Sequence, residues 1–299
     1  MMKKPFFTGV CTALVTPFRE NTVWWEQLEK LLVRQAEAGI PAVVLSGTTG
    51  EAPVLSKEEK LQLIRFRRRL LGGRMQLIAG TGSNDTRTSV ALSKAAEDAG
   101  ADALLVVSPY YNKATESGLI AHYTAVAEAV RIPIILYNVP GRTGLDIPVS
   151  VYRELSVISN IAGVKEAGPA VSKISEIRSV CGADFPVWSG NDRDVLSAIA
   201  LGARGIISVI SNLLPVSFSH LVKEALAGRF SDARKQYDAL YPLLKGLSRD
   251  INPVPIKAAL RLSGLDCGSC RLPLTDLSEA NKEKLADLLT EIKTGPGSR

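Results

Sequence analysis

Eight short apolar runs recur along the chain, each followed by a polar or glycine-containing turn and then by an amphipathic segment. The runs lack the polar alternation of a strand with one wet face, so they indicate strands that are buried on both faces, as in parallel sheets. The eight predicted strands are Val10–Val15, Ala42–Leu45, Met75–Ala79, Ala103–Val107, Pro133–Tyr137, Ile161–Lys165, Pro186–Trp188 and Gly205–Ser208.

The segments between the runs carry helix signals. Ser56 and Glu59 have the spacing of a capping box, in which each side chain accepts the backbone N–H of the other residue. Gly39 stands where a helix would end in a left-handed glycine. Pro148 fits the first turn of a further helix. The chain therefore predicts repeated strand–helix units.

Eight parallel strand–helix units in one chain are the pattern of a (β/α)8 TIM barrel, an α/β fold that typically takes about 250 residues. An open, doubly wound sheet is the alternative, but it usually has fewer strands, and no G-x-G-x-x-G follows the first run. We expect the barrel to occupy residues 1–228. Residues 229–299 have no strand-like run and predict two or three helices, packed outside the barrel or between subunits.

The composition is that of a globular protein, with 46% apolar and 22% charged residues, which argues against intrinsic disorder. A net charge of +6 over 299 residues is too dilute to indicate a nucleic-acid partner. We interpret the densest cationic cluster as the solvated side and end of one helix. Its members are Arg65, Arg67, Arg68, Arg69 and Arg74.

No run reaches the roughly 18–20 apolar residues of a membrane span, and the first residues lack the sustained apolar region of a secretion signal. We therefore expect a cytoplasmic protein with no membrane partner. Cys267 and Cys270 form one C-x-x-C without a second pair. We interpret them as incidental thiols, and we find no ligand set for a metal.

Enzymes built on this barrel place their active site at the carboxyl ends of the strands. Lys165 closes an apolar run, so its amine is expected to point into the mouth of the barrel. Partial burial disfavours the charged form of a lysine, and a neutral amine can attack a carbonyl carbon to form an imine. The alternatives from this position alone are a lysine that reaches solvent or one that pairs with Glu166.

Tyr137 ends the neighbouring run and can carry a proton to and from a substrate oxygen if a partner holds its hydroxyl. Thr48 and Thr49 supply hydroxyls beside Gly47 and Gly50, whose missing side chains let backbone N–H groups approach a carboxylate. The alternative for these last four residues is a tight strand-to-helix turn without a ligand.

Arg142 lies on a loop at the same face, and its planar, two-pronged guanidinium suits a second carboxylate. An ordinary surface charge is the alternative. Tyr110 and Tyr111 follow another run, where aromatic packing is the alternative to a role in the site. Together these residues indicate an imine-forming lysine, a proton relay and two carboxylate anchors.

Eight segments of the chain form a specific set: GTTGE (47–51), YYN (110–112), YNVPGRT (137–143), GVKEA (163–167), SGND (189–192), GIIS (205–208), NPVPIK (252–257) and RLPL (271–274). As a set they resemble the dihydrodipicolinate synthase family. Its members are pyruvate-dependent aldolases of lysine and diaminopimelate biosynthesis. The likeness runs through nearly the whole chain.

The resemblance implies a covalent mechanism without a cofactor. Lys165 would form a Schiff base with pyruvate, and Tyr137 would transfer protons. Thr49 would link Tyr137 to Tyr111 of the partner subunit, in a homotetramer arranged as a dimer of dimers. The second substrate would be L-aspartate 4-semialdehyde, whose aldehyde carbon is attacked by the pyruvate-derived enamine.

The resemblance also implies which residues bind these substrates. Thr48 and Thr49 would hold the carboxylate of pyruvate, and Arg142 would hold the carboxylate of the semialdehyde. Gly190 and Ile207 would contribute backbone contacts. We therefore expect these five residues around one cavity.

Two rival functions stay open at this point. N-acetylneuraminate lyases and keto-deoxy-sugar-acid aldolases of the same superfamily would share Lys165 and Tyr137, but sialic acid lyases lack an arginine at the place of Arg142. A non-catalytic keto-acid-binding regulator is the second rival. The chain departs from the family at Gly168–Pro169, where Thr or Ser followed by Gly is common. That departure bears on where the next helix begins.

Many members of this family are inhibited by lysine at a subunit interface, through a serine, histidines, an asparagine, a tyrosine and a glutamate. The chain keeps Asn84 and Tyr110 but differs at the other places, with Ala52 next to Pro53, Lys57, Lys60 and Thr88. A ligand ammonium that is half-buried without a counter-charge is costly. The resemblance therefore predicts weak or absent inhibition by lysine.

Overall fold

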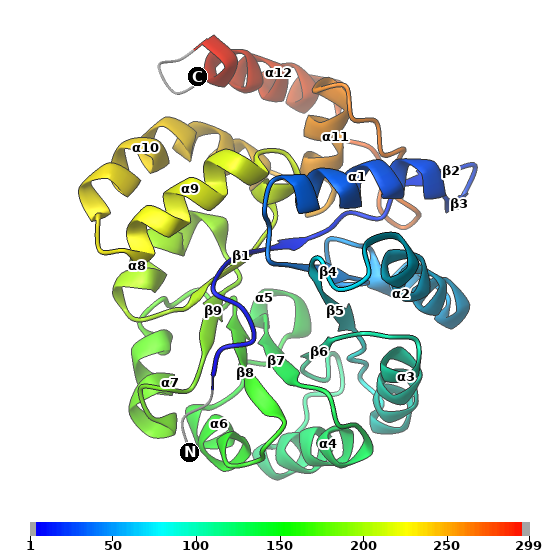
Figure 1. The fold of residues 1–299 in the computed structure, drawn as a ribbon, viewed down its shortest axis with the longest axis vertical. Coiled ribbons are helices and arrows are strands. Elements are labelled where there is room, and N and C mark those ends of the chain that lie inside the picture. Colours follow the sequence, from blue (N-terminus) through cyan, green and yellow to red (C-terminus); the bar gives the residue numbers. More distant parts are fainter. Residues whose placement is uncertain (1–3, 295–299) are drawn as a thin grey trace.

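Eight parallel strands close into a barrel in a computed structural model that describes residues 4–294. Helices surround this ring of strands (Figure 1). The strand order is β1-β10-β9-β8-β7-β6-β5-β4. The barrel strands are β1 (Gly9–Ala13), β4 (Ala42–Leu45), β5 (Gln76–Gly80), β6 (Ala103–Val107), β7 (Ile134–Asn138), β8 (Ile161–Glu166), β9 (Val187–Ser189) and β10 (Gly205–Ser208). The expected TIM-barrel fold is confirmed.

A helix follows each barrel strand along the chain. These helices are α1 (Trp25–Glu37), α2 (Lys57–Leu71), α3 (Thr86–Asp98), α4 (Glu116–Ala129), α6 (Val149–Ser156), α7 (Lys173–Cys181), α8 (Val195–Ala200) and α9 (Pro215–Leu226). Shorter helical pieces lie in the loops after β4, β7, β9 and β10, namely η1 (Ala52–Val54), α5 (Pro140–Thr143), η2 (Asp192–Asp194) and η3 (Ile210–Asn212). A small antiparallel hairpin that the sequence did not predict precedes α1, formed by β2 (Phe18–Arg19) and β3 (Thr22–Val23).

The helix signals in the sequence fall at helix ends. The Ser56 hydroxyl accepts the N–H of Glu59 at 3.1 Å, and Glu59 accepts the N–H of Ser56 at 2.9 Å, so the capping box of α2 is confirmed. Gly39 follows α1 with a φ of 69°. Pro148 is the residue just before α6 rather than a member of its first turn.

One prediction from the arginine cluster is wrong. The Arg67 side chain is fully buried, and its Nη1 donates to the carbonyl of Gly72 at 2.9 Å and lies 3.6 Å from Asp102. Arg67 shares the inward face of α2 with Leu63 and Leu71, because residues three to four apart lie on one face of a helix. The cluster is therefore only partly solvated.

Two stacked aromatic rings help to fill the interior of the barrel. Phe7, just before β1, stacks on Trp188 of β9 with ring centroids 4.8 Å apart. The indole N–H of Trp188 donates to the carbonyl of Phe7 at 3.2 Å. Both side chains belong to the inner apolar cluster, which continues upward to Tyr137 and Ile207. The space at the carboxyl ends of the strands is therefore bounded by a packed interior.

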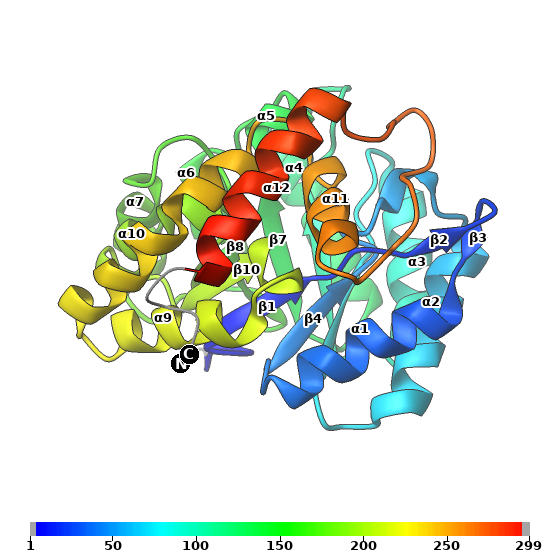
Figure 2. The same ribbon diagram turned by 90° about the horizontal axis from the view of Figure 1, so that it is seen from above.

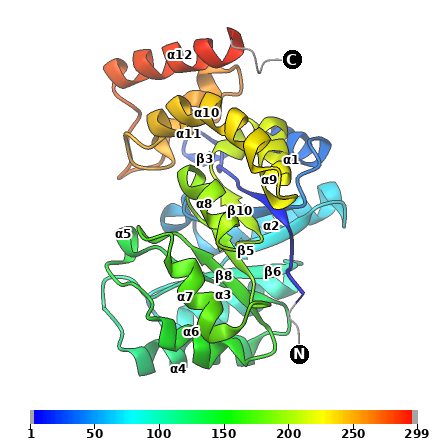
Figure 3. The ribbon, with the colours of Figure 1, turned by 90° about the vertical axis from the view of Figure 1, so that its left-hand side faces the viewer.

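The last part of the described chain forms three helices, α10 (Phe230–Leu247), α11 (Val254–Leu262) and α12 (Glu279–Thr294). α10 packs on α9, and α12 packs on both α10 and α11 (Figure 2). These helices lie on one side of the barrel, far from α4 and α6 (Figure 3). None of the helices within residues 4–294 is long and apolar enough to cross a membrane.

We predict that Phe7→Ala lowers the free energy of unfolding by about 3–5 kcal/mol, because it removes a buried ring and leaves a cavity under Trp188. Urea unfolding followed by tryptophan fluorescence measures the change. Phe230→Ala, at a partly exposed ring, is the control and should cost much less. Equal losses in the two variants would contradict the prediction.

Candidate active site

Lys165 lies near the carboxyl end of β8 with its side chain inside the barrel and only 6% of its surface exposed. Its Nζ lies 4.2 Å from the centroid of the Tyr137 ring. The two residues meet because they are direct partners in the parallel register of β7 and β8. Neither alternative for Lys165 is seen: the residue is buried, and within the described residues Glu166 is bound by other groups.

Two ionisable side chains near the barrel mouth have pKa values that the charge of Lys165 affects, namely Cys11 of β1 and Asp192 after β9. Burial raises the pKa of the Cys11 thiol, which keeps it neutral. Burial also raises the pKa of Asp192. Its Oδ2 accepts hydrogen bonds from the backbone N–H groups of Val209 and Ile210, at 3.0 and 2.8 Å, and these bonds lower the pKa in part. The charge of Lys165 also acts in the direction opposite to burial and lowers both pKa values in part.

A cavity of about 530 Å³ opens above Lys165 at the carboxyl ends of the strands. Six of the residues expected at the site line it: Thr48, Thr49, Tyr137, Arg142, Lys165 and Gly190. Ile207 is fully buried in β10, belongs to the inner cluster and is not among the residues that line this cavity. Tyr111 lies outside the cavity of its own chain, with 90% of its surface exposed.

Gly190 makes room for the lysine arm. A β-carbon at this position would lie 2.5 Å from the β-carbon of Ala167 and 2.9 Å from Cε of Lys165. Both distances are shorter than real contacts of this kind, so any side chain would displace Lys165 or the chain after it. The glycine is therefore needed for the observed position of the amine.

A buried ion pair between Glu51 and Lys257 holds the turn that carries Thr48 and Thr49. Glu51 follows the turn with a φ of 57°. Its Oε1 accepts Nζ of Lys257 at 2.7 Å, and its Oε2 accepts the backbone N–H of Arg271 at 2.9 Å. The side chains of Lys257 and Glu51 are 3% and 1% exposed. Breaking such a buried pair leaves an uncompensated charge, so the contact constrains the turn strongly.

Asn252, in the connection between α10 and α11, joins both expected carboxylate anchors. Its side-chain Nδ2 donates a hydrogen bond to Oγ1 of Thr49 at 3.0 Å. Its backbone carbonyl accepts a hydrogen bond from Nη2 of Arg142 at 2.9 Å. The sequence indicated Asn252 only as part of the NPVPIK segment, since no local pattern shows that it lies beside residues more than a hundred positions away. Asp192 was likewise noted only within the SGND segment.

The family model of the dihydrodipicolinate synthetase family matches residues 6–292. The chain belongs to this family. It is 45% identical over 290 residues to the 4-hydroxy-tetrahydrodipicolinate synthase of Acetivibrio thermocellus, an alignment that covers 97% of this chain and 99% of that protein. The resemblance noted in the sequence is thereby confirmed.

Solved structures of dihydrodipicolinate synthases match the fold over nearly its whole length. The chloride-inhibited enzyme of Acinetobacter baumannii, complexed with pyruvate, is 42% identical with a TM-score of 0.93, covering 95% of this chain and 98% of that one. The enzyme of Cyanidioschyzon merolae with lysine bound is 34% identical with a TM-score of 0.93, covering 97% and 99%.

A second cavity, of about 400 Å³, lies beside the first in this member of the family. The two cavities share Thr48, Tyr137, Val139 and Arg142 in their linings. The second is also lined by four positions that the family resemblance connects with lysine: Ala52, Lys60, Thr88 and Tyr110. Lys57 and Asn84 are not among its lining residues.

The cysteines and possible metal ligands of the described chain are arranged without an evident site. No three His, Cys, Asp or Glu side chains within residues 4–294 are placed to hold a metal ion. Burial raises the pKa of Cys267 and of Cys270 to about 12 each. Both therefore stay protonated near neutral pH. A protonated thiol is a poor nucleophile and a poor metal ligand.

Proposed function

We propose that this member of the family condenses pyruvate with L-aspartate 4-semialdehyde through an imine on Lys165, yielding 4-hydroxy-tetrahydrodipicolinate for lysine and diaminopimelate biosynthesis. The observation that carries the proposal is the buried Lys165 amine over the Tyr137 ring, below a cavity lined by Thr48, Thr49 and Arg142. The name of the Acetivibrio relative and the pyruvate in the Acinetobacter structure support it.

The first half of the reaction takes place on pyruvate. The Lys165 amine adds to the ketone carbon and water leaves, which gives an imine whose protonated nitrogen withdraws electrons from the methyl group. Thr48 and Thr49 hold the carboxylate with their hydroxyls and the N–H groups of the turn. Tyr137 carries the protons that these steps exchange, and removal of a methyl proton gives an enamine. No cofactor is needed.

The second half joins the two substrates. Arg142 binds the carboxylate of the semialdehyde, which brings its aldehyde carbon to the enamine, and a carbon–carbon bond forms. The amine of the semialdehyde then attacks the imine carbon, closes the ring and releases Lys165. Gly190 and Ile207 contribute backbone contacts in this proposal. The rival aldolases act on sugar acids, for which Arg142 is not the expected anchor.

The proposal extends to the assembly and the cell compartment. Tyr111 is exposed, and its N–H donates to the carbonyl of Thr143, so its ring is free to enter the site of a second copy. We place Tyr111 of the partner subunit beside Thr49, in a cytoplasmic homotetramer built as a dimer of dimers. We also propose two domains, a barrel within residues 1–228 and an appended helical region within residues 229–299, which supplies Asn252.

We predict that borohydride reduction in the presence of pyruvate adds a pyruvate-derived mass to the peptide that contains Lys165. Mass spectrometry of a protease digest measures it. Lys165→Ala should show no adduct, whereas the control Lys223→Ala, at an exposed lysine of α9, should show the full adduct. An adduct on another residue, or none in the wild type, would overturn the imine proposal.

We predict that Arg142→Ala weakens the use of the semialdehyde about tenfold or more, because a hydrogen bond to a charged group contributes about 1.5–3 kcal/mol. Steady-state kinetics with each substrate varied in turn measure the effect. Trapping of pyruvate should survive, as it should in the control Arg153→Ala, an exposed arginine of α6. Lost trapping with unchanged use of the semialdehyde would contradict the assignment.

We predict weak or absent inhibition by L-lysine. The ligand's ammonium groups need a carboxylate, and Thr88 cannot supply one in the second cavity. Lys60 lines the same cavity, and its positive charge would repel the ammonium groups of the ligand. A titration of activity against L-lysine at saturating substrates tests this, and cooperative inhibition at sub-millimolar lysine would refute it.

A further inference from the structure

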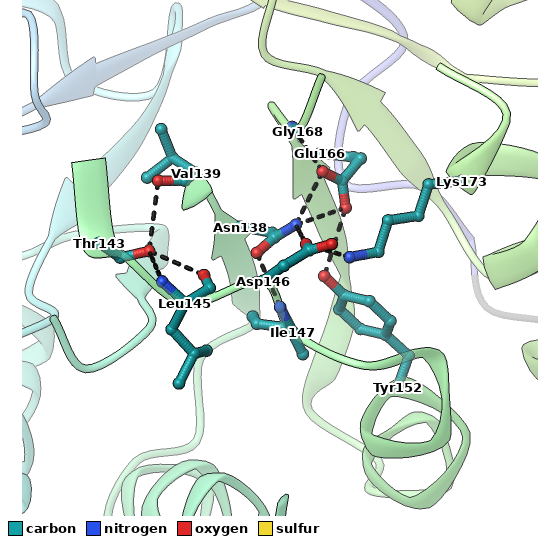
Figure 4. A network of polar contacts seen from close by, with 10 residues as sticks. All are labelled: Asn138, Val139, Thr143, Leu145, Asp146, Ile147, Tyr152, Glu166, Gly168 and Lys173. Atoms are coloured by element: carbon teal, nitrogen blue, oxygen red, sulfur yellow. Dashed lines mark hydrogen bonds and ion pairs between the residues drawn. The ribbon is translucent and has the colours of Figure 1, made fainter. Parts of the chain in front are cut away.

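Two buried polar side chains lie on the outer wall of the barrel, directly behind the catalytic pair. Asn138 follows Tyr137 in β7, and Glu166 follows Lys165 in β8. Successive side chains of a strand point to opposite faces, so Asn138 and Glu166 face the helices while Tyr137 and Lys165 face the interior. Both outer residues are almost fully buried. Figure 4 shows the polar contacts that they make with each other and with their neighbours. Apolar residues would serve stability alone at such positions at least as well.

The Glu166 carboxylate is bound from three sides. Nδ2 of Asn138 donates to its Oε1 at 2.9 Å and to its Oε2 at 3.1 Å, across the two strands. The backbone N–H of Gly168 donates to Oε1 at 2.6 Å, and the Tyr152 hydroxyl of α6 donates to Oε2 at 3.4 Å. The carboxylate is therefore tied to β7, to its own loop and to a helix.

The amide of Asn138 has only one workable orientation. Its Nδ2 also donates to Oδ1 of Asp146 at 2.7 Å, while its Oδ1 accepts the N–H of Ile147 at 3.1 Å. A reversed amide would place an oxygen against two carboxylates and a donor against a donor. Lys173 of α7 pairs with Asp146 and supplies the positive charge of the cluster.

The pKa of Glu166 is raised, because burial outweighs the effect of these partners. Burial raises the pKa of Glu166, while the charge of Lys173 and the hydrogen bonds from Asn138 and Gly168 act in the opposite direction. Charge-assisted hydrogen bonds of this kind are stronger than neutral ones. The bond between Asn138 and Glu166 is thus a firm link between the ends of β7 and β8.

The register of these two strands needs such a link. It shifts at the start of the pair, where Ile134 faces Ile161 but Ile135 faces Gly163. Beyond this bulge Tyr137 faces Lys165, and Asn138 faces Glu166. A slip of one residue would turn Lys165 to the outer face, because side chains alternate along a strand. The bulge lies at one end of the pairing and the polar link at the other.

We propose that Asn138 and Glu166 are positioning residues whose hydrogen bonds across β7 and β8 fix the register that holds the Lys165 amine over Tyr137, and so set the rate of imine formation. The proposal rests on the imine-forming function proposed above. Neither side chain touches a substrate, since both point away from the cavity.

The departure of this chain at Gly168 belongs to the same arrangement. A β-carbon there would lie 2.8 Å from Oε1 of Glu166, closer than such atoms approach. The glycine therefore allows its N–H to reach the carboxylate at 2.6 Å. The following helix, α7, begins only at Lys173. The glycine at this departure thus supplies one of the hydrogen bonds that hold Glu166.

The test measures the rate constant of imine formation at saturating pyruvate, by borohydride quenching at successive times. Glu166→Ala and Asn138→Ala should slow it about tenfold or more, the change expected when hydrogen bonds to a charged group are lost. Glu166→Gln keeps the shape and one acceptor oxygen, so it should restore part of the rate. The matched control Glu154→Gln, at an exposed glutamate of α6, should behave as the wild type.

The rate constant separates positioning from simple loss of structure. A destabilised variant contains fewer folded molecules, which lowers the amount of trapped protein but leaves the rate constant of the folded fraction unchanged. The double variant Asn138→Ala/Glu166→Ala should be no slower than the slower single one, because both act through one contact. Unchanged rate constants in the single variants, or additive effects in the double one, would overturn the proposal. A wild type that traps no pyruvate would instead refute the proposed function.

Discussion

β1 pairs in parallel with both β4 and β10, and this closure of the barrel determines where every functional side chain lies. In an open sheet the ends of the first and last strands would be far apart. In the closed ring, all eight carboxyl ends surround one mouth. Thr49 follows β4, Lys165 lies near the end of β8 and Gly190 follows β9, yet the three residues line a single cavity for that reason.

Charges buried around this mouth are each held by fixed partners. Glu51 is paired with Lys257, Asp192 accepts two backbone N–H groups, and Glu166 is bound by Asn138 and Gly168. Such groups add little net stability compared with apolar packing, but removing one partner leaves an unpaired charge. Burying these groups costs free energy of folding. The protein thus gives up some stability, and in return its turn, its Lys165 amine and its loops keep one arrangement.

The strands could be predicted from the sequence because burial on both faces leaves continuous apolar runs. The hairpin of β2 and β3 could not, since strands of two residues carry no periodicity. The prediction of a solvated arginine cluster was wrong at Arg67 because it considered the charge of the residue alone. The position of Arg67 along α2 places it on the buried face of the helix. Composition alone cannot supply that position.

The same distinction applies to the site. Lys165 and Tyr137 could be identified because each closes a strand whose end is known to face the mouth. Asn252 and Thr49 are 203 positions apart, and no local pattern records their contact. The role of Glu166 depends on the bulge in β8, which becomes visible only when both strands are seen paired.

The late position of Asn252, Lys257 and Arg271 in the chain has a consequence for biosynthesis. A ribosome releases the eight barrel strands first, since the last of them ends at Ser208. Until the following segment emerges, Glu51 is a carboxylate without its counter-ion, and Thr49 and Arg142 lack the residue that joins them. A chain without this segment therefore lacks the contacts that support the turn of Thr48 and Thr49.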